Sequence, residues 1–261
     1  MGRKRAGWVP DQHGAWSMIT LPFAIGLIEA VRAGVSGSWT ATLFAFWLLG
    51  YFAFNAASGW LKAPPRRRPP FAKPLATYVI ASAVAGLATV LLGGWGMAWW
   101  AVVYVPLLLP ALWLASRRRE RATLGGALTI AAASLMLLVV RFPDPVTLLD
   151  AGADAVRPLL LAGAMFAYFF GTVLYVKTNI RERGSRPFLI ASIGWHAGAT
   201  VAASALASAG PLPWWWAGFF LITTVRAADV PRRVWTPRRI GFLEACLCVV
   251  MLIGHLVSRP G

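Results

Sequence analysis

Nine hydrophobic segments, each close to the length of a membrane-spanning helix, dominate the sequence. A helix needs about 20 consecutive apolar residues to cross the hydrocarbon core of a bilayer, and no stretch between the segments is long enough for a soluble domain. The sequence therefore predicts an all-α fold, a polytopic membrane helical bundle that occupies residues 1–261 as a single integral membrane domain. The expected spans are roughly 15–31, 39–61, 74–93, 97–116, 122–141, 156–178, 187–208, 212–229 and 239–257.

Connections that are rich in lysine and arginine alternate along the chain with connections that have few. Of the 25 Lys and Arg residues, 21 fall on the N-terminal segment and on the connections after the second, fourth, sixth and eighth spans. The other side keeps only Arg32, Arg141, Arg157 and Arg259. Cytoplasmic loops of membrane proteins carry such an excess of Lys and Arg. We therefore expect the N-terminus in the cytoplasm and the C-terminus outside.

The composition argues against other classes of protein. Residues are 58% hydrophobic and 13% charged, whereas a soluble domain is nearer a quarter charged. A formal net charge of +16 is typical of nucleic-acid-binding proteins, but the apolar content and 14 Trp assign the basic residues to a membrane surface. Cys246 and Cys248 lie inside a hydrophobic segment and can form neither a disulfide framework nor a complete zinc site. We expect membrane lipids as partners, and no nucleic acid, cofactor or metal.

Polar residues gather just before the first span, in the segment Pro10-Asp11-Gln12-His13-Gly14-Ala15-Trp16. Asp11 can cap the helix that follows, and Trp16 can lie at the membrane interface. These ordinary roles leave His13 unexplained. His13 is therefore a candidate ligand-binding residue, with an interfacial hydrogen bond as the alternative.

The end of the second span carries a second group of polar residues. Asn55 and Ser58 are three residues apart and Lys62 follows four residues later, so all three share one helix face. A basic run at 66–68 comes next. This face is suited to admit an anion, although packing through small residues and ordinary cytoplasmic charge would also explain it.

The end of the sixth span carries a third group, made of Lys177, Asn179, Arg181, Glu182 and Arg183. Polar residues at membrane depth are candidates for functional sites. Long basic side chains near a helix end can instead reach back to the interface, but this does not explain Asn179 or Glu182. The segment is therefore a second candidate part of a ligand-binding site.

The second and third groups share a pattern, in which a glycine-containing apolar helix is followed by Asn, a basic stretch and Pro-Phe. This predicts a weak four-helix internal repeat, as in membrane folds with a central cavity. Deep in the seventh span, His196 is a further candidate, although a buried histidine more often hydrogen-bonds a neighbouring helix. Glu244, near the start of the ninth span, is placed to neutralise an Arg of the preceding connection.

The segments 10–16 and 177–183 resemble the YwiC-like family of bacterial membrane proteins. This resemblance would cover nearly the whole chain, and it implies the plasma (inner) membrane of a bacterium. More distantly, nine spans with polar segments after the second and sixth are similar to the UbiA-type intramembrane prenyltransferases. In that family, Asp-rich motifs in these two loops hold magnesium against an isoprenyl diphosphate, whose tail lies in a lipid-facing tunnel. Asn55 matches the first residue of the first motif, and Arg68-Pro69 matches the Arg-Pro step after it.

The sequence departs from the UbiA pattern at the metal ligands. No carboxylate lies between Asn55 and Lys73, and the second loop offers only Glu182, whereas magnesium takes several oxygen ligands and usually carboxylates. Lys and Arg can hold phosphate oxygens directly. We therefore expect a UbiA-like scaffold with a basic, cytoplasm-facing cavity that binds an anionic or phosphate-bearing isoprenoid or lipid-like ligand, as an enzyme or as a lipid-binding accessory.

Two other functions fit the same residues. One is a transporter or exporter of a small anionic metabolite, and the other is a non-catalytic assembly partner of a membrane complex. A transporter needs a polar route to the outer face. Because the outer halves of the spans contain few polar residues, the sequence favours ligand binding.

The distribution of basic residues makes a topological prediction. Reporter fusions or cysteine accessibility in intact cells should place Arg119 and Arg232 in the cytoplasm and Asp150 outside, because connections rich in Lys and Arg stay inside. Finding Asp150 on the same side as Arg119 would rule out nine spans with this orientation.

Overall fold

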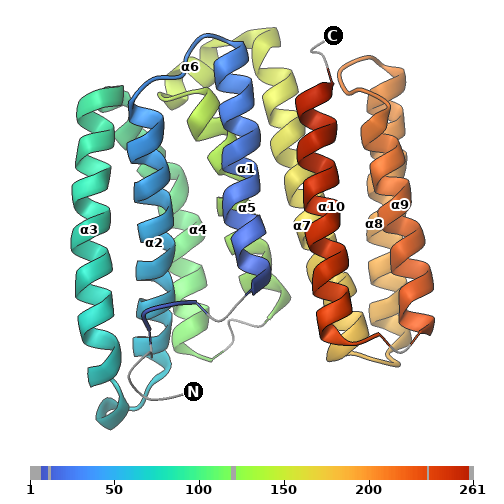
Figure 1. Ribbon diagram of the computed structural model, residues 1–261, viewed down its shortest axis with the longest axis horizontal. Coiled ribbons are helices and arrows are strands. Elements are labelled where there is room, and N and C mark those ends of the chain that lie inside the picture. The colour runs from blue at the N-terminus through green and yellow to red at the C-terminus, as the bar shows by residue number, and fades with distance from the viewer. Residues whose placement is uncertain (1–6, 11–12, 119–121, 234, 259–261) are drawn as a thin grey trace.

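The computed structural model describes residues 7–10, 13–118, 122–233 and 235–258. They form ten α-helices joined by short turns, with no β-strand among the described residues (Figure 1). The helices are α1 (His13–Arg32), α2 (Trp39–Lys62), α3 (Pro69–Gly93), α4 (Trp100–Ser116), α5 (Thr123–Arg141), α6 (Pro145–Asp150), α7 (Val156–Ile180), α8 (Arg186–Ser208), α9 (Trp215–Asp229) and α10 (Pro237–Val257).

Proline and glycine set several of the helix ends. The first turns of α3, α6, α8 and α10 contain Pro69, Pro145, Pro187 and Pro237. Proline suits this position because an N–H there has no partner inside the helix. Gly94 ends α3 with a φ of +98°, which glycine adopts without a steric penalty.

Helices α1, α5 and α7 form the centre of the bundle. In α5 and in α7, 56% of the most apolar stretch of the helix is buried inside the protein, against 11% in α2 and in α3. Helices α2, α3 and α4 lie on one side of these central helices, and α8, α9 and α10 lie on the other (Figure 1). The core side chains of Ile25, Leu137 and Met165 have no exposed surface. The central helices therefore bury the largest share of apolar surface and hold the two outer groups together.

Eight of the helices, α1 to α5, α7, α8 and α10, are long and apolar enough to cross a membrane. The polytopic helical bundle expected from the sequence is thus confirmed. The exception is the segment expected at 212–229, because α9 has only 15 residues. At about 1.5 Å per residue, it is shorter than the hydrocarbon core. Pro213 delays the start of α9 by disfavouring a helical conformation in the residue before it. Even so, α9 runs alongside α8 (Figure 1).

The connections α2–α3, α4–α5, α7–α8 and α9–α10 lie at one end of the bundle, which we call the basic end (Figure 1, bottom). Two hydrogen bonds join neighbouring connections there. Arg118 Nη2 donates to the carbonyl oxygen of Lys62 at 3.2 Å, and Arg183 Nη2 donates to that of Arg233 at 3.3 Å. The connections that share an excess of Lys and Arg in the sequence are therefore neighbours in space.

A buried ionic cluster lies at the opposite end, so the expectation of few polar groups there is wrong. Glu29 of α1 accepts from Arg32 at 3.0 Å, from Arg157 of α7 at 3.1 Å and pairs with His255 of α10 at 3.1 Å. Arg32 Nη2 also donates to the carbonyl oxygens of His255 at 3.2 Å and of Leu256 and Ser258 at 3.0 Å. A buried carboxylate needs such partners, and they fasten α1, α7 and α10 together.

Because α1 and α5 pack closely at Gly26, a Gly→Ala substitution there should affect stability differently from the same substitution at Gly163. A Cβ at Gly26 would lie 2.8 Å from the carbonyl oxygen of Leu137, whereas one at Gly163 of α7 would meet no atom within 4 Å. Gly26→Ala should lower the free energy of unfolding by about 1–3 kcal/mol through overpacking. The control Gly163→Ala should be neutral or stabilising by up to about 1 kcal/mol. Unfolding of both variants in detergent, followed by circular dichroism, tests this; equal effects would contradict the close packing.

Candidate functional site

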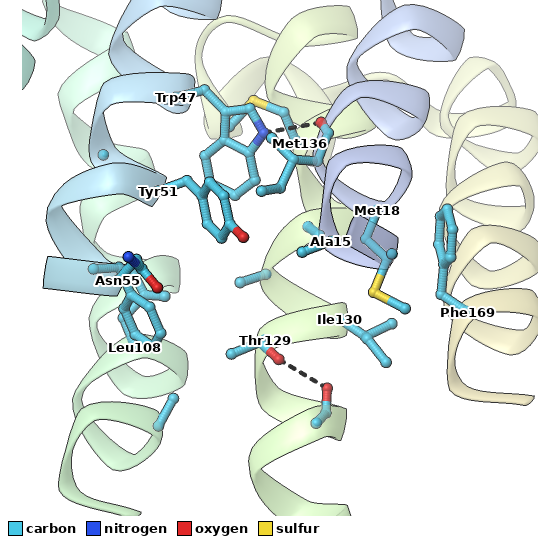
Figure 2. Close-up of a pocket in the computed structure, with 18 of the residues that line it drawn as sticks. Ala15, Met18, Trp47, Tyr51, Asn55, Leu108, Thr129, Ile130, Met136 and Phe169 are labelled. Atoms are coloured by element: carbon cyan, nitrogen blue, oxygen red, sulfur yellow. Dashed lines mark hydrogen bonds between the residues drawn. The ribbon is translucent and has the colours of Figure 1, made fainter. Parts of the chain in front are cut away.

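A cavity of about 1810 Å³ lies in the middle of the bundle, lined by residues of α1, α2, α3, α4, α5, α7 and α10. In Figure 2, Tyr51 and Asn55 of α2 lie across the cavity from Thr129 of α5, with Leu108 of α4 and Ala15 of α1 nearby. Sites for small molecules usually measure about 300–1,000 Å³. This cavity therefore has room for a ligand larger than a typical metabolite.

Four basic residues line the cavity at the basic end: Lys62, Lys177, Arg181 and Arg238. We call this set the basic mouth. They come from the ends of α2, α7 and α10, which are far apart in the sequence. Lys177 Nζ donates to Thr123 Oγ1 at 2.9 Å, which ties the end of α7 to the start of α5. The basic mouth concentrates positive charge where the cavity meets the surface of the bundle, so it attracts anions.

The interior of the cavity is apolar and aromatic. Trp47 and Tyr51 of α2, Met136 of α5 and Phe169 of α7 all line it (Figure 2). Trp47 Nε1 donates to the carbonyl oxygen of Ile19 at 3.0 Å, so even this indole presents mainly its apolar face. An interior of this kind suits a hydrocarbon chain rather than a charged metabolite.

Bulky side chains line the cavity at the end opposite the basic mouth. Leu43, Met97 and Trp100 line it there and are only 3%, 7% and 5% exposed. Trp100 Nε1 donates to the carbonyl oxygen of Phe142 at 2.9 Å, which holds the indole in place. Bulky buried side chains thus line the far end of the cavity, whereas Arg181 and Arg238 of the basic mouth are exposed.

The cavity also reaches the apolar outer surface along α4. Val105 and Leu109 line it, yet they are 49% and 60% exposed. In a membrane protein, an exposed apolar side chain in the middle of a span faces lipid. The cavity is therefore continuous with the lipid-facing side of the bundle, and a hydrocarbon chain can extend from one into the other.

The polar face predicted on α2 lines the cavity. Asn55, Ser58 and Lys62 are all among its lining residues, as their helical spacing indicates. Ser58 is 8% exposed, and its Oγ has no hydrogen-bond partner among the described residues. The face expected on α2 therefore lines the cavity, although Ser58 Oγ itself is buried.

Only some of the residues predicted at the end of α7 line the cavity. Lys177 and Arg181 line the cavity, but Asn179, Glu182 and Arg183 do not. Asn179 is 8% exposed and donates from Nδ2 to the carbonyl oxygen of Tyr175 at 2.8 Å. At 3.6 residues per turn, a residue two positions after Lys177 faces the opposite side of the helix. Asn179 is therefore not the structural equivalent of Asn55, and the proposed internal repeat does not extend to these asparagines.

His13 opens α1, but its side chain lies outside the described part of the structure, so its predicted role stays a prediction. The next two residues, Gly14 and Ala15, line the cavity. The first turn of α1 therefore borders the cavity, and the N-terminal end of a helix carries a partial positive charge. This charge adds to that of the basic mouth.

A buried ion pair lies in the wall of the cavity, at residues that the sequence did not indicate as part of a site. Arg226 of α9 donates from Nη1 to Glu244 Oε1 of α10, and the two side chains are only 4% and 14% exposed. Glu244 Oε2 accepts from Tyr168 at 3.2 Å and from Thr172 at 2.9 Å, both on α7. The expectation that Glu244 neutralises a preceding Arg is confirmed. The partner, Arg226, lies within α9. A single Arg in a mostly apolar segment is the feature of the sequence that indicates it.

His196 belongs to this network rather than to the cavity lining. It is 1% exposed, its Nδ1 lies 2.7 Å from the carbonyl oxygen of Ser192, and its Nε2 lies 3.0 Å from Arg226 Nη2. The guanidinium of Arg226 also stacks over the ring of Tyr175 at 4.2 Å. The interpretation of His196 as a buried histidine bonded to a neighbouring helix is therefore confirmed. Its effect on a ligand would act through Arg226 and Glu244.

Apolar spanning helices, buried intramembrane charges and a central cavity define a multi-pass α-helical membrane protein. Comparison with known proteins then identifies its family. The chain matches the YwiC-like protein family over residues 9–141. It is also 30% identical over 251 residues to the uncharacterized protein YwiC of Bacillus subtilis (strain 168), covering 94% of this chain and 96% of that protein. The chain therefore belongs to the YwiC-like family. No solved structure matches it, and the likeness to UbiA-type enzymes stays a hypothesis.

Because the ion pair is buried, replacing Arg226 alone should destabilise the protein more than replacing Arg226 and Glu244 together. Arg226→Met leaves Glu244 without its cationic partner, which should lower the free energy of unfolding by about 3–5 kcal/mol. The double variant Arg226→Met/Glu244→Leu removes both charges and should be much closer to the wild type. Unfolding in detergent measures both variants. A double variant at least as unstable as the single variant would show that charge balance is not what this pair provides.

Proposed function

We propose that the protein binds an amphiphilic ligand with a phosphate-bearing head and an isoprenoid or lipid-like chain. In this proposal the head binds at the basic mouth, and the chain lies in the apolar interior and extends towards lipid along α4. One observation carries the proposal. Two polar segments that are far apart in the sequence, at the ends of α2 and α7, line a single cavity whose interior is apolar.

The charges of the cavity support an anionic head without a bridging metal ion. Lys62, Lys177, Arg181 and Arg238 line it, while Glu244, the one acidic residue of the described lining, is already paired with Arg226. A net positive mouth repels a divalent cation and attracts phosphate, most strongly where water is excluded. The described residues contain no group of three or more His, Cys, Asp or Glu side chains that could hold a metal ion.

The position of the cavity also favours binding over transport of a small anion. Leu43, Met97 and Trp100 are bulky and buried where they line the end opposite the basic mouth, and the ionic cluster around Glu29 fastens α1, α7 and α10. We further propose that the basic end faces the cytoplasm of a bacterial cell and that the protein resides in the plasma membrane, because an excess of Lys and Arg marks cytoplasmic loops.

Dodecyl phosphate, titrated into the protein in nanodiscs, tests this function. Removing a basic group that contacts the phosphate directly should cost about 2–5 kcal/mol of binding free energy, so Lys177→Ala and Arg181→Ala should weaken binding at least about tenfold. Arg66→Ala is the matched control, since Arg66 is exposed outside the cavity lining and surface charges are screened. EDTA should leave the affinity unchanged. Equal effects of all three substitutions, or loss of binding on chelation, would overturn the proposal.

A further inference from the structure

Glu244 stands apart from the other charged residues that line the cavity. It is the one carboxylate of the described lining, and it lies six residues after Arg238 on α10. At 1.5 Å per residue, Glu244 is about 9 Å further from the basic end than Arg238. Its carboxylate therefore borders the apolar interior, where the proposed anionic head would not bind.

The hydrogen bonds of Glu244 leave room for a further donor. A carboxylate offers about four acceptor positions. Among the described residues, Arg226 donates to Oε1, and Tyr168 and Thr172 donate to Oε2. These three donors come from α9 and α7, so they hold the carboxylate in one orientation. One acceptor position on Oε1 is thus not used by these donors, in a side chain that is 14% exposed and lines the cavity.

The charge balance decides which donor fits. Arg226 already neutralises Glu244, so a cationic ligand group would bring an uncompensated charge into the apolar interior, and an anionic group would be repelled. A neutral O–H group brings no net charge, and it replaces its lost bond to water with a bond to a carboxylate. Burial of polar groups is favourable only with such compensation. Phe169, Val173 and Ala245 add apolar surface to the lining next to the donors Tyr168 and Thr172, so a largely apolar ligand with one hydroxyl group fits there.

We propose that Glu244 is a recognition site for an apolar alcohol, accepting a hydrogen bond from its neutral hydroxyl group inside the cavity. Arg226, Tyr168 and Thr172 act as positioning residues, because they hold the carboxylate but leave one acceptor position. This site goes beyond the function proposed above. That function concerns an anionic head at the basic mouth, whereas this site selects a neutral group deeper in the cavity.

Three probes with the same chain test the two sites separately in nanodiscs: 1-dodecanol, dodecyl methyl ether and dodecyl phosphate. The ether keeps the chain and the oxygen of the alcohol but carries a methyl group in place of the O–H donor. A hydrogen bond to a charged group is worth enough to change affinity about tenfold. Wild-type protein should therefore bind dodecanol about tenfold more tightly than the ether. Arg226→Met/Glu244→Leu, which keeps the site neutral, should bind the two equally.

The phosphate probe separates the two proposals. Circular dichroism shows whether the double variant is folded, and its affinity for dodecyl phosphate should change far less than its preference for the alcohol over the ether. Equal affinities for the alcohol and the ether in wild-type protein would overturn the alcohol site, as would an alcohol preference that survives in the double variant. Failure of the wild type to bind dodecyl phosphate, with the alcohol preference intact, would instead overturn the proposed function at the basic mouth.

Discussion

The ion pair between Arg226 and Glu244 is the interaction on which the second half of the bundle depends. A charge within a bilayer is costly unless it is paired, and each member of this pair has further partners. Arg226 contacts His196 of α8 and the ring of Tyr175, while Glu244 accepts from α7. One network therefore joins α7, α8, α9 and α10. Because α9 is too short to span by itself, this network and the packing on α8 hold it in place.

The same principle organises the opposite end of the bundle. Glu29 is the acceptor shared by Arg32, Arg157 and His255, and these partners lie on three helices. Lipid is as apolar as the side chains in the helix interfaces, so the hydrophobic effect contributes little to association within the membrane. Polar networks at specific places then decide which helices are neighbours. Here the Glu29 network fastens α1, α7 and α10, and the network around Arg226 and Glu244 joins α7, α8, α9 and α10.

The cavity combines features that a single helix cannot provide. Its basic residues come from the ends of three helices, its apolar interior from the middle of several, and its single described carboxylate from α10. This arrangement separates charge by depth, with positive groups at the surface and a neutralised ion pair further in. An amphiphilic ligand has the same order of polar and apolar parts, which is why the site suits such a molecule better than a small soluble anion.

Hydrophobic length and the distribution of Lys and Arg determined the number and ends of most helices, because both act locally along the chain. They also grouped the basic connections at one end, and helical spacing placed Asn55, Ser58 and Lys62 on one face. The rotation of each helix about its axis, by contrast, is set by packing against neighbours. That rotation put Lys177 in the cavity and Asn179 outside it. It also brought His196 to Arg226 and Glu29 to His255, contacts that the sequence did not indicate. The sequence alone thus determined which segments form long apolar helices, apart from α9, and only the tertiary structure decided which polar groups meet between them.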